Sequence, residues 1–127
     1  MPTTTQHLAQ AATNERLALA WEATDPEWAV TALFYAALHY VDAFFYLDGQ
    51  INHTLDGFRS HTERTVEVAH RLTSVFVAYK RLLDRSREAR YDCVTFNTGW
   101  VQRLRESSLL PIKQHVETEL RILDLSP

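Results

Sequence analysis

Glycine and proline are scarce in this chain, with three and four residues among 127. Because tight turns and hairpins depend on these two residue types, there is little material here for β-structure. Cysteine occurs once, as Cys93, which excludes an internal disulfide and predicts a reducing compartment, the cytoplasm. The N-terminus also lacks the basic and apolar segments of a signal peptide. These absences favour an all-α cytoplasmic protein.

An excess of positive charge is lacking as well. Thirteen Lys and Arg residues face sixteen Asp and Glu residues, which gives a formal net charge of −3. A chain with this balance has no general affinity for polyanions, so any nucleic-acid contact must come from a local basic patch. The length fits one domain with a real core, and we place this single domain at residues 7–124.

Residues 28–47, WAVTALFYAALHYVDAFFYL, form the longest apolar run. Its length matches the roughly 20 residues that cross a bilayer. His39 and Asp42 near its middle, without Lys or Arg at its ends, argue against a membrane span. Because apolar residues surround nearly the whole predicted helix, we interpret it as the central helix of a bundle in a soluble protein.

Apolar periodicity elsewhere predicts an up-and-down bundle of four to five antiparallel helices. The first helix is expected from Thr4 or Thr5 to Ala23, with Thr5 as a possible cap. The expected signals around the second helix are Asp25 as the cap, Pro26 in the first turn and Gly49 just past the end.

After the central helix the sequence predicts four irregularities. After a loop at residues 48–60, a helix is expected to start near His61, with Ser60 and Glu63 as a capping box. The expected later breaks are a bend at 71–74 capped by Thr73 and Ser74, an interruption at 97–99, and a kink near Pro111 within a last helix at 100–123.

Six side chains form a continuous, half-polar stripe on one face of the central helix, at spacings of three and four residues, and its polar part is Tyr35, His39, Asp42 and Tyr46. The six side chains are Trp28, Thr31, Tyr35, His39, Asp42 and Tyr46. His39 and Asp42, one turn apart, have two interpretations. The pair is half of a general-base unit, or it is a buried histidine hydrogen-bonded by an aspartate for structural reasons.

A basic segment spans residues 80–90, with five basic residues against two acids, for a local charge of +3. Arg87, Arg90 and Tyr91 fall on neighbouring helix faces, where arginines contact phosphates and a tyrosine stacks on a base. Alternatively the segment is a solvated face whose charges pair at helical spacing, such as Lys80 with Asp84.

A second cationic candidate lies in SHTER, residues 60–64. His61 and Arg64 stand one turn apart at a predicted helix start, where free backbone donors and the helix dipole favour anions. Capping accounts for Ser60 and Glu63 but not for the histidine and the arginine. These two residues are therefore further candidates for a ligand contact.

No metal or cofactor is predicted. Glu67 and His70 form a single Glu-x-x-His, whereas a two-metal carboxylate bundle requires that motif on two helices. The sequence contains no His-x-x-x-His, and Cys93 has no partner at zinc spacing. We expect Cys93 to be a small buried side chain, as free cysteines usually are.

The runs WAVTALFYAALHYVDAFF, SHTER and YKRLLDRSREARYD, followed by a last helix, resemble a HEPN domain (higher eukaryotes and prokaryotes nucleotide-binding). The resemblance covers nearly the whole chain, about residues 7–124. It implies a bundle of four to five helices, commonly a homodimer, in a family that includes toxin-type endoribonucleases of toxin–antitoxin pairs.

Nucleases of the family carry an arginine followed, after four to six residues, by a histidine. Here YDCVTFNTG follows Arg90 without a histidine, and Arg64 and His70 match the count earlier in the chain but lie on different helix faces. The chain is therefore similar to the branch without the catalytic histidine, which is associated with nucleotide, RNA or partner binding.

Three functional hypotheses follow. The first is a non-catalytic homodimeric module that binds RNA or a nucleotide through Arg87, Arg90 and Tyr91, together with His61 and Arg64. The second is a metal-independent endoribonuclease in which His61, His70 or His39 acts as general acid or base. The third is an interaction subunit that binds a protein partner.

Overall fold

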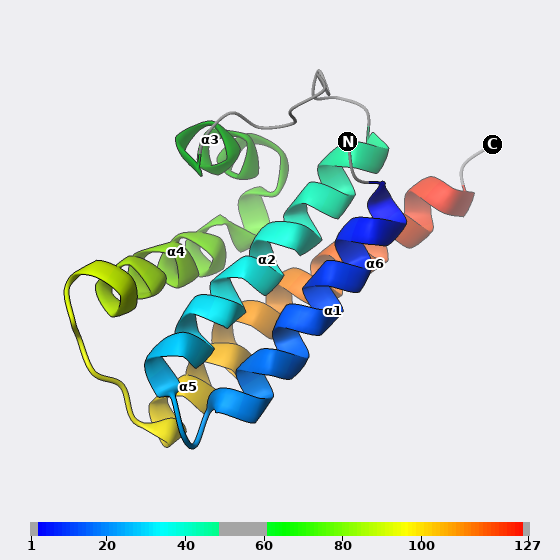
Figure 1. The fold of residues 1–127 in the computed structure, drawn as a ribbon. Helices are drawn as coiled ribbons and strands as arrows, with labels where there is room; N and C mark the ends of the chain where they lie inside the picture. The colour runs from blue at the N-terminus through cyan, green and yellow to red at the C-terminus, as the bar shows by residue number, and fades with distance from the viewer. Residues whose placement is uncertain (1–2, 49–60, 126–127) are drawn as a thin grey trace.

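The computed structural model describes residues 3–48 and 61–125, and within these ranges the chain is helical with no strand (Figure 1). The predicted all-α class is therefore confirmed. The elements are α1 (Thr4–Trp21), α2 (Pro26–Asp48), α3 (His61–Arg71), a 3₁₀ turn (Thr73–Val75), α4 (Phe76–Tyr91), α5 (Thr98–Leu104), a π-helical turn (Arg105–Leu109) and α6 (Leu110–Leu125).

Helices α1 and α2 form the expected hairpin. The cap of α1 is Thr3 rather than Thr5, because the Thr3 side chain accepts from the Gln6 backbone N–H while the Gln6 side chain accepts from that of Thr3. Helix α2 starts at Pro26, where the missing N–H costs nothing, and the carbonyl of Asp25 accepts its first backbone bond from Ala29. Asp48, the first residue of the loop expected at 48–60, belongs to α2, whereas the expected stop at Gly49, residues 49–60 of that loop and the Ser60 cap lie outside the described residues.

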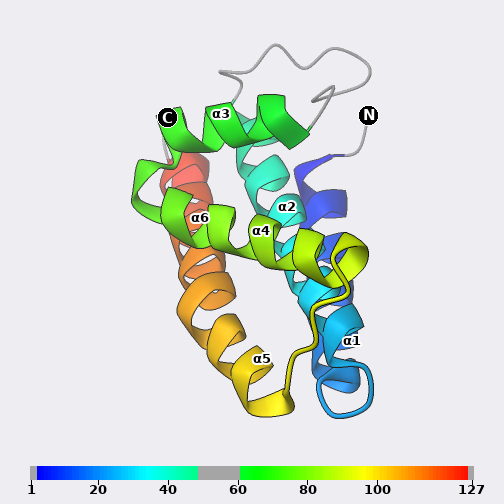
Figure 2. The ribbon, with the colours of Figure 1, turned by 90° about the vertical axis from the view of Figure 1, so that its left-hand side faces the viewer.

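The arrangement differs from a strictly antiparallel, up-and-down bundle (Figures 1 and 2). Helix α2 runs antiparallel to α1, but α5 and α6 run in the same direction as α2, and α3 and α4 cross the long helices. Only short connections force neighbouring helices to be antiparallel. The α1–α2 connection is short, whereas 49–60 and 92–97 are long enough to permit other directions.

The bend between α3 and α4 falls where it was predicted, but the predicted caps are wrong. The Thr73 hydroxyl donates to the carbonyl of Ala69 at 2.9 Å, so it closes the end of α3 instead of opening α4. The 3₁₀ turn and α4 begin after Leu72 and Val75, neither of which makes a side-chain cap bond. The turn is instead fixed by burial of these two apolar side chains in the core.

Pro111 accompanies a local change in helix geometry near the predicted place, but the helix does not end there. A wide π turn at Arg105–Leu109 directly precedes it, and the N–H of Leu110 donates to the carbonyl of Arg105. A π turn changes the bonding register, which accommodates a residue that cannot donate. The chain consequently stays helical from α5 into α6.

Helix α2 lies at the centre of one hydrophobic core, and the other helices supply the rest. Core side chains from around the bundle include Ala18, Leu33, Phe34, Phe45, Val68, Leu82, Val101 and Ile112. Within the described residues, Pro26–Tyr46 is one helix long and apolar enough to cross a membrane, and 83% of the relevant window is buried inside the protein. Packing of this helix by its neighbours is sufficient to explain its apolar character.

Candidate functional site

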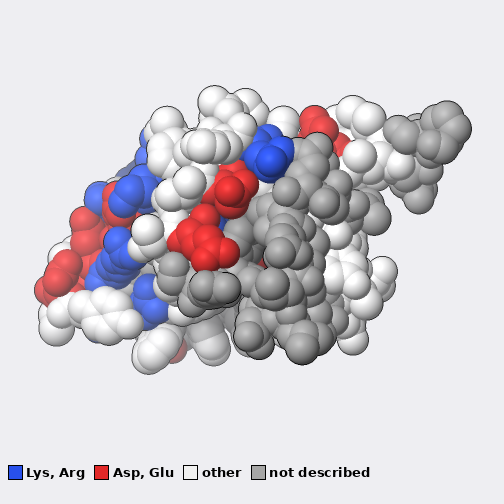
Figure 3. Space-filling model, turned by 90° about the horizontal axis from the view of Figure 1, so that it is seen from above, with Lys and Arg blue, Asp and Glu red and all other residues white. Residues whose placement is uncertain are grey.

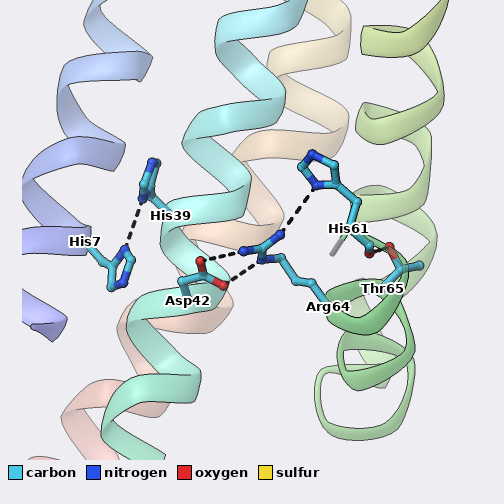
Figure 4. A network of polar contacts seen from close by, with 6 residues as sticks. All are labelled: His7, His39, Asp42, His61, Arg64 and Thr65. Atoms are coloured by element: carbon cyan, nitrogen blue, oxygen red, sulfur yellow. Dashed lines mark hydrogen bonds and ion pairs between the residues drawn. The ribbon is translucent and has the colours of Figure 1, made fainter. Parts of the chain in front are cut away.

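The predicted polar stripe of α2 divides between two neighbouring helices (Figure 4). His39 faces α1, where its Nδ1 lies 3.1 Å from Nδ1 of His7, whereas Asp42 bonds Arg64 on α3. Residues three apart point about 60° away from each other around a helix, which is enough to reach different neighbours. The expected contact between His39 and Asp42 is therefore replaced by two separate pairs.

Asp42 and Arg64 form a bidentate ion pair. Nε of Arg64 donates to Oδ1 at 2.8 Å and Nη2 donates to Oδ2 at 3.1 Å, with each side chain only 11% exposed. Paired, parallel bonds of this kind are the strongest that arginine makes with a carboxylate. The charge of Arg64 is thus neutralised locally, so the predicted role of Arg64 as an anion contact becomes one of positioning.

His61 is positioned by Arg64 and by aromatic rings. Nη1 of Arg64 lies 3.4 Å from Nδ1 of His61, and because a guanidinium can only donate, this ring nitrogen accepts. The rings of Phe34 and Tyr35 lie 5.6 and 6.4 Å away, centroid to centroid. Burial, followed by the charges of Arg64, Arg90 and Arg87, lowers the pKa of His61. Neutral His61 therefore carries its proton on Nε2.

Arg90 approaches the same place from α4. Its Nη1 donates to the Tyr35 hydroxyl at 2.9 Å, and its Nε and Nη2 donate to the carbonyl and hydroxyl of Ser86, both at 3.3 Å. Its guanidinium carbon lies 5.5 Å from the ring centre of Tyr35 and 5.1 Å from that of Tyr91. Among the described residues only neutral groups bond Arg90, and no carboxylate forms an ion pair with it.

The rest of the basic segment is mixed. Lys80 pairs with Asp84 as predicted, at 2.6 Å, and Arg85 pairs with Glu88 at 2.8 Å. Arg87 is exposed and makes no ion pair with a described residue, yet it is close enough to depress the pKa of His61. The solvated-face interpretation therefore describes the first half of the segment, and the site interpretation describes Arg87 and Arg90.

A pocket of about 340 Å³ opens beside Arg90, lined also by Glu27, Trp28, Thr31 and Ala89. Trp28 is 60% exposed, an unusual position for so large an aromatic side chain. Oε1 of Glu27 accepts from the backbone N–H of Phe96 at 3.3 Å, which ties the pocket to the connection between α4 and α5. This volume is in the range of small-molecule sites.

Other predicted residues lie elsewhere or at the margin. Tyr91 is 72% exposed at the end of α4, and Tyr46 is half-buried one turn beyond Asp42. His70 is exposed in the last turn of α3. Burial and the neighbouring His7 lower the pKa of His39. His39 thus belongs to the contact with α1 and not to the group formed by His61, Arg87 and Arg90.

The prediction of a buried Cys93 is wrong. Cys93 is exposed, with a φ of 54°, in the left-handed conformation that a glycine usually adopts after a helix. The chain reverses there, and the N–H of Val94 donates to the carbonyl of Glu88 at 3.3 Å.

Across the described residues, no group of three or more His, Cys, Asp or Glu side chains is placed to hold a metal ion.

Sequence reasoning missed four supporting residues. Ser86 stands four residues before Arg90, so its contact was available from helical spacing alone. Glu27 and His7 gave no signal, because their contacts depend on how α2 packs against distant segments. Tyr79 also escaped notice. Its buried hydroxyl lies beside Arg64 and Thr65 without a well-formed hydrogen bond, and burial raises its pKa.

Comparison with known proteins adds no assignment: no protein-family model, curated protein or solved structure matches the chain.

The surface itself is mixed in charge. Seen from above, basic and acidic side chains are interspersed on the described face (Figure 3). On this face, the described residues form no continuous basic surface.

Proposed function

We propose that this protein is a non-catalytic, HEPN-like module that binds a phosphate group of RNA or of a nucleotide at His61, Arg87 and Arg90. The observation that carries the proposal is the environment of Arg90. A guanidinium held by Tyr35 and Ser86, without an ion pair to a described carboxylate, is fixed in orientation and stays available to an anion. A phosphate supplies the missing negative charge and matches the planar fork of donors.

The remaining donors suit such a ligand. Three of the five N–H donors of a guanidinium are used in the contacts of Arg90, which leaves two for an anion. Nε2–H of His61 is a further donor, and Arg87 adds an exposed charge. The Asp42–Arg64 pair orients His61 without contributing net charge, so the ligand is recognised mainly by α4.

The test is a titration with single-stranded RNA at several salt concentrations. Each lost phosphate contact flattens the slope of log affinity against log salt by about 0.7, so Arg90→Ala is expected to weaken binding and to reduce the slope by that amount. Arg121→Ala is the matched control, because Arg121 is exposed near the end of α6, away from the end of α4 (Figure 1). An unchanged slope in Arg90→Ala contradicts the proposal.

Self-association is part of the same proposal. Exposed apolar side chains on the long helices and on α3 and α4 provide surface for a second copy or another protein partner. They include Leu19, Val66 and Val77. Light scattering at micromolar concentration is expected to give a dimer, and a monomer contradicts this part.

A second candidate function is a metal-independent endoribonuclease, favoured by the state of His61. A neutral imidazole among arginines can accept a proton from a ribose hydroxyl at Nδ1, once Nδ1 releases its bond from Arg64, while the guanidinium groups stabilise the phosphoryl charge. Under this alternative, cleavage of RNA persists in EDTA and is lost in His61→Ala. Retained cleavage in that variant eliminates His61 as the base, and no cleavage by the unaltered protein favours the binding module.

A further inference from the structure

We infer that the pocket beside Arg90 binds the base of a guanosine phosphate, with Trp28 as the stacking surface and Glu27 as the group that selects guanine. This inference rests on the proposed function, because it extends the phosphate contact at Arg90 to a complete ligand. The shared chemistry is a guanine with a phosphate, from either a free nucleotide or an RNA strand.

Arg90 connects the two halves of this site. Its guanidinium bonds the Tyr35 hydroxyl, and its side chain also lines the pocket with Trp28 and Thr31. Trp28 and Tyr35 lie two turns apart on α2, roughly 10 Å along the axis. A nucleotide lying along α2 can therefore place its phosphate at Arg90 and His61 while its base reaches Trp28.

Trp28 supplies a surface that the fold does not use. With 60% of the residue exposed at the mouth of the pocket, its indole remains free to stack on a flat ring. An aromatic platform next to an arginine is the usual basis of base binding in single-stranded nucleic-acid proteins. Stacking alone does not distinguish among bases, because every base has a π-face.

Glu27 is the group that distinguishes guanine from the other bases. One of its oxygens accepts from Phe96 N–H, and each carboxylate oxygen has a second lone pair for a ligand. Guanine presents two adjacent N–H donors on its Watson–Crick edge, at N1 and N2, which match the two oxygens of a carboxylate. The corresponding edges of adenine, cytosine and uracil present acceptors beside any donor, and these face a carboxylate unfavourably.

The backbone around Glu27 is well fixed for this role. The Thr31 hydroxyl donates to the Glu27 carbonyl at 3.2 Å, and the bond from Phe96 restrains the carboxylate. A half-buried acceptor that is already oriented loses little freedom when a ligand binds. A site built to satisfy hydrogen-bond donors also rejects analogues that lack them more strongly than an apolar pocket does.

The experiment is a titration of tryptophan fluorescence with guanosine monophosphate, adenosine monophosphate and inorganic phosphate. Quenching by the guanine nucleotide is expected, with an affinity about tenfold or more above that of the adenine nucleotide. Trp28→Phe, at an exposed position, is expected to lose most of the quenching. Short RNAs that differ by one guanine-to-adenine exchange are the second arm, and preference only in this arm identifies RNA as the source of the guanine.

Glu27→Gln is expected to reduce the guanine-to-adenine ratio to about one, because an amide offers one acceptor and adds donors. Glu106→Gln, at an exposed glutamate of the π turn, is the matched control and should keep the ratio. Absence of a guanine preference in both the nucleotide arm and the RNA arm, or an unaltered ratio in Glu27→Gln, overturns the inference while leaving phosphate binding at Arg90 intact. No binding of the three compounds or of the short RNAs overturns the proposed function as well.

Discussion

The two polar faces of α2 differ in how completely the polar side chains around them are paired within the fold. On the α1 side, His39 and His7 form a closed contact between two rings, Nδ1 to Nδ1 at 3.1 Å. On the α3 and α4 side, a balanced ion pair stands beside Arg90, which is held only by neutral groups among the described residues. The comparison indicates that polarity at a helix contact can serve packing alone, whereas a held charge without an ion-pair partner points to a ligand.

Proton occupancy separates the two faces further. A hydrogen bond between two histidine nitrogens needs one donor and one acceptor, so the His7–His39 contact excludes protonation of both rings at their facing atoms. At His61 the nearby arginines disfavour protonation, but a bound anion would reverse that effect. We therefore expect the first contact to respond to acid and the second to respond to anions.

The largest expected loss of stability follows from breaking the Asp42–Arg64 ion pair. Asp42→Leu leaves a nearly buried guanidinium without its partner and should lower the free energy of unfolding by about 3 kcal/mol. Replacing both residues, by Asp42→Leu with Arg64→Met, removes both charges and should cost less than the single change. Denaturant melts measure all three proteins, and a double variant that loses the sum of the two single losses contradicts this account.

A smaller effect is expected at the histidine pair. His39→Leu removes a half-buried ring and leaves His7 without that partner atom, so the loss of unfolding free energy should be about 1 kcal/mol. The same melts at pH 7.5 or above provide the value, because the pKa of His39 is lowered from its ordinary 6.5 and this ring is neutral there. A loss equal to that of Asp42→Leu would show that the two faces do not differ as described.

Acid should destabilise the protein through these histidines. The folded-state pKa values of His39 and His61 lie below the ordinary value of 6.5, so the unfolded chain binds more protons in this range. The contribution of these two histidines to the free energy of unfolding is complete above about pH 6.5. It is lost as the pH falls toward their lower folded-state pKa values. The groups that act on His39 are His7, Asp42 and Arg64. His39→Leu should reduce the pH dependence, and an unchanged dependence contradicts its assignment to the pair.

Tyr35→Phe should have the smallest effect on stability. It removes one neutral hydrogen bond to Arg90 from a half-buried position, at a cost of about 0.5–1 kcal/mol. Phosphate affinity should fall in the same variant, because Arg90 loses a contact that orients it. A melt combined with a phosphate titration separates the two effects, and an unaltered affinity removes Tyr35 from the site.

The sequence predicted elements better than contacts. Periodicity and start signals located α2, the start of α3 and the break near Leu72, because these depend on neighbours along the chain. The direction of α5 and α6, the exposure of Cys93 and the partners of His39 and Asp42 depend on long-range packing. Spacing placed Arg87 and Arg90 together, but only the fold brings His61 and Tyr35 to them.

The most direct test of the difference between the two faces follows the imidazole signals of the six histidines by nuclear magnetic resonance during a sulfate titration near neutral pH. Sulfate stays an anion throughout this range, so only the protein titrates. The account predicts that the His61 signal moves and that its pKa rises as sulfate binds, while the signals of His7 and His39 stay in place. Movement of His7 and His39 with an unaffected His61 would contradict the account.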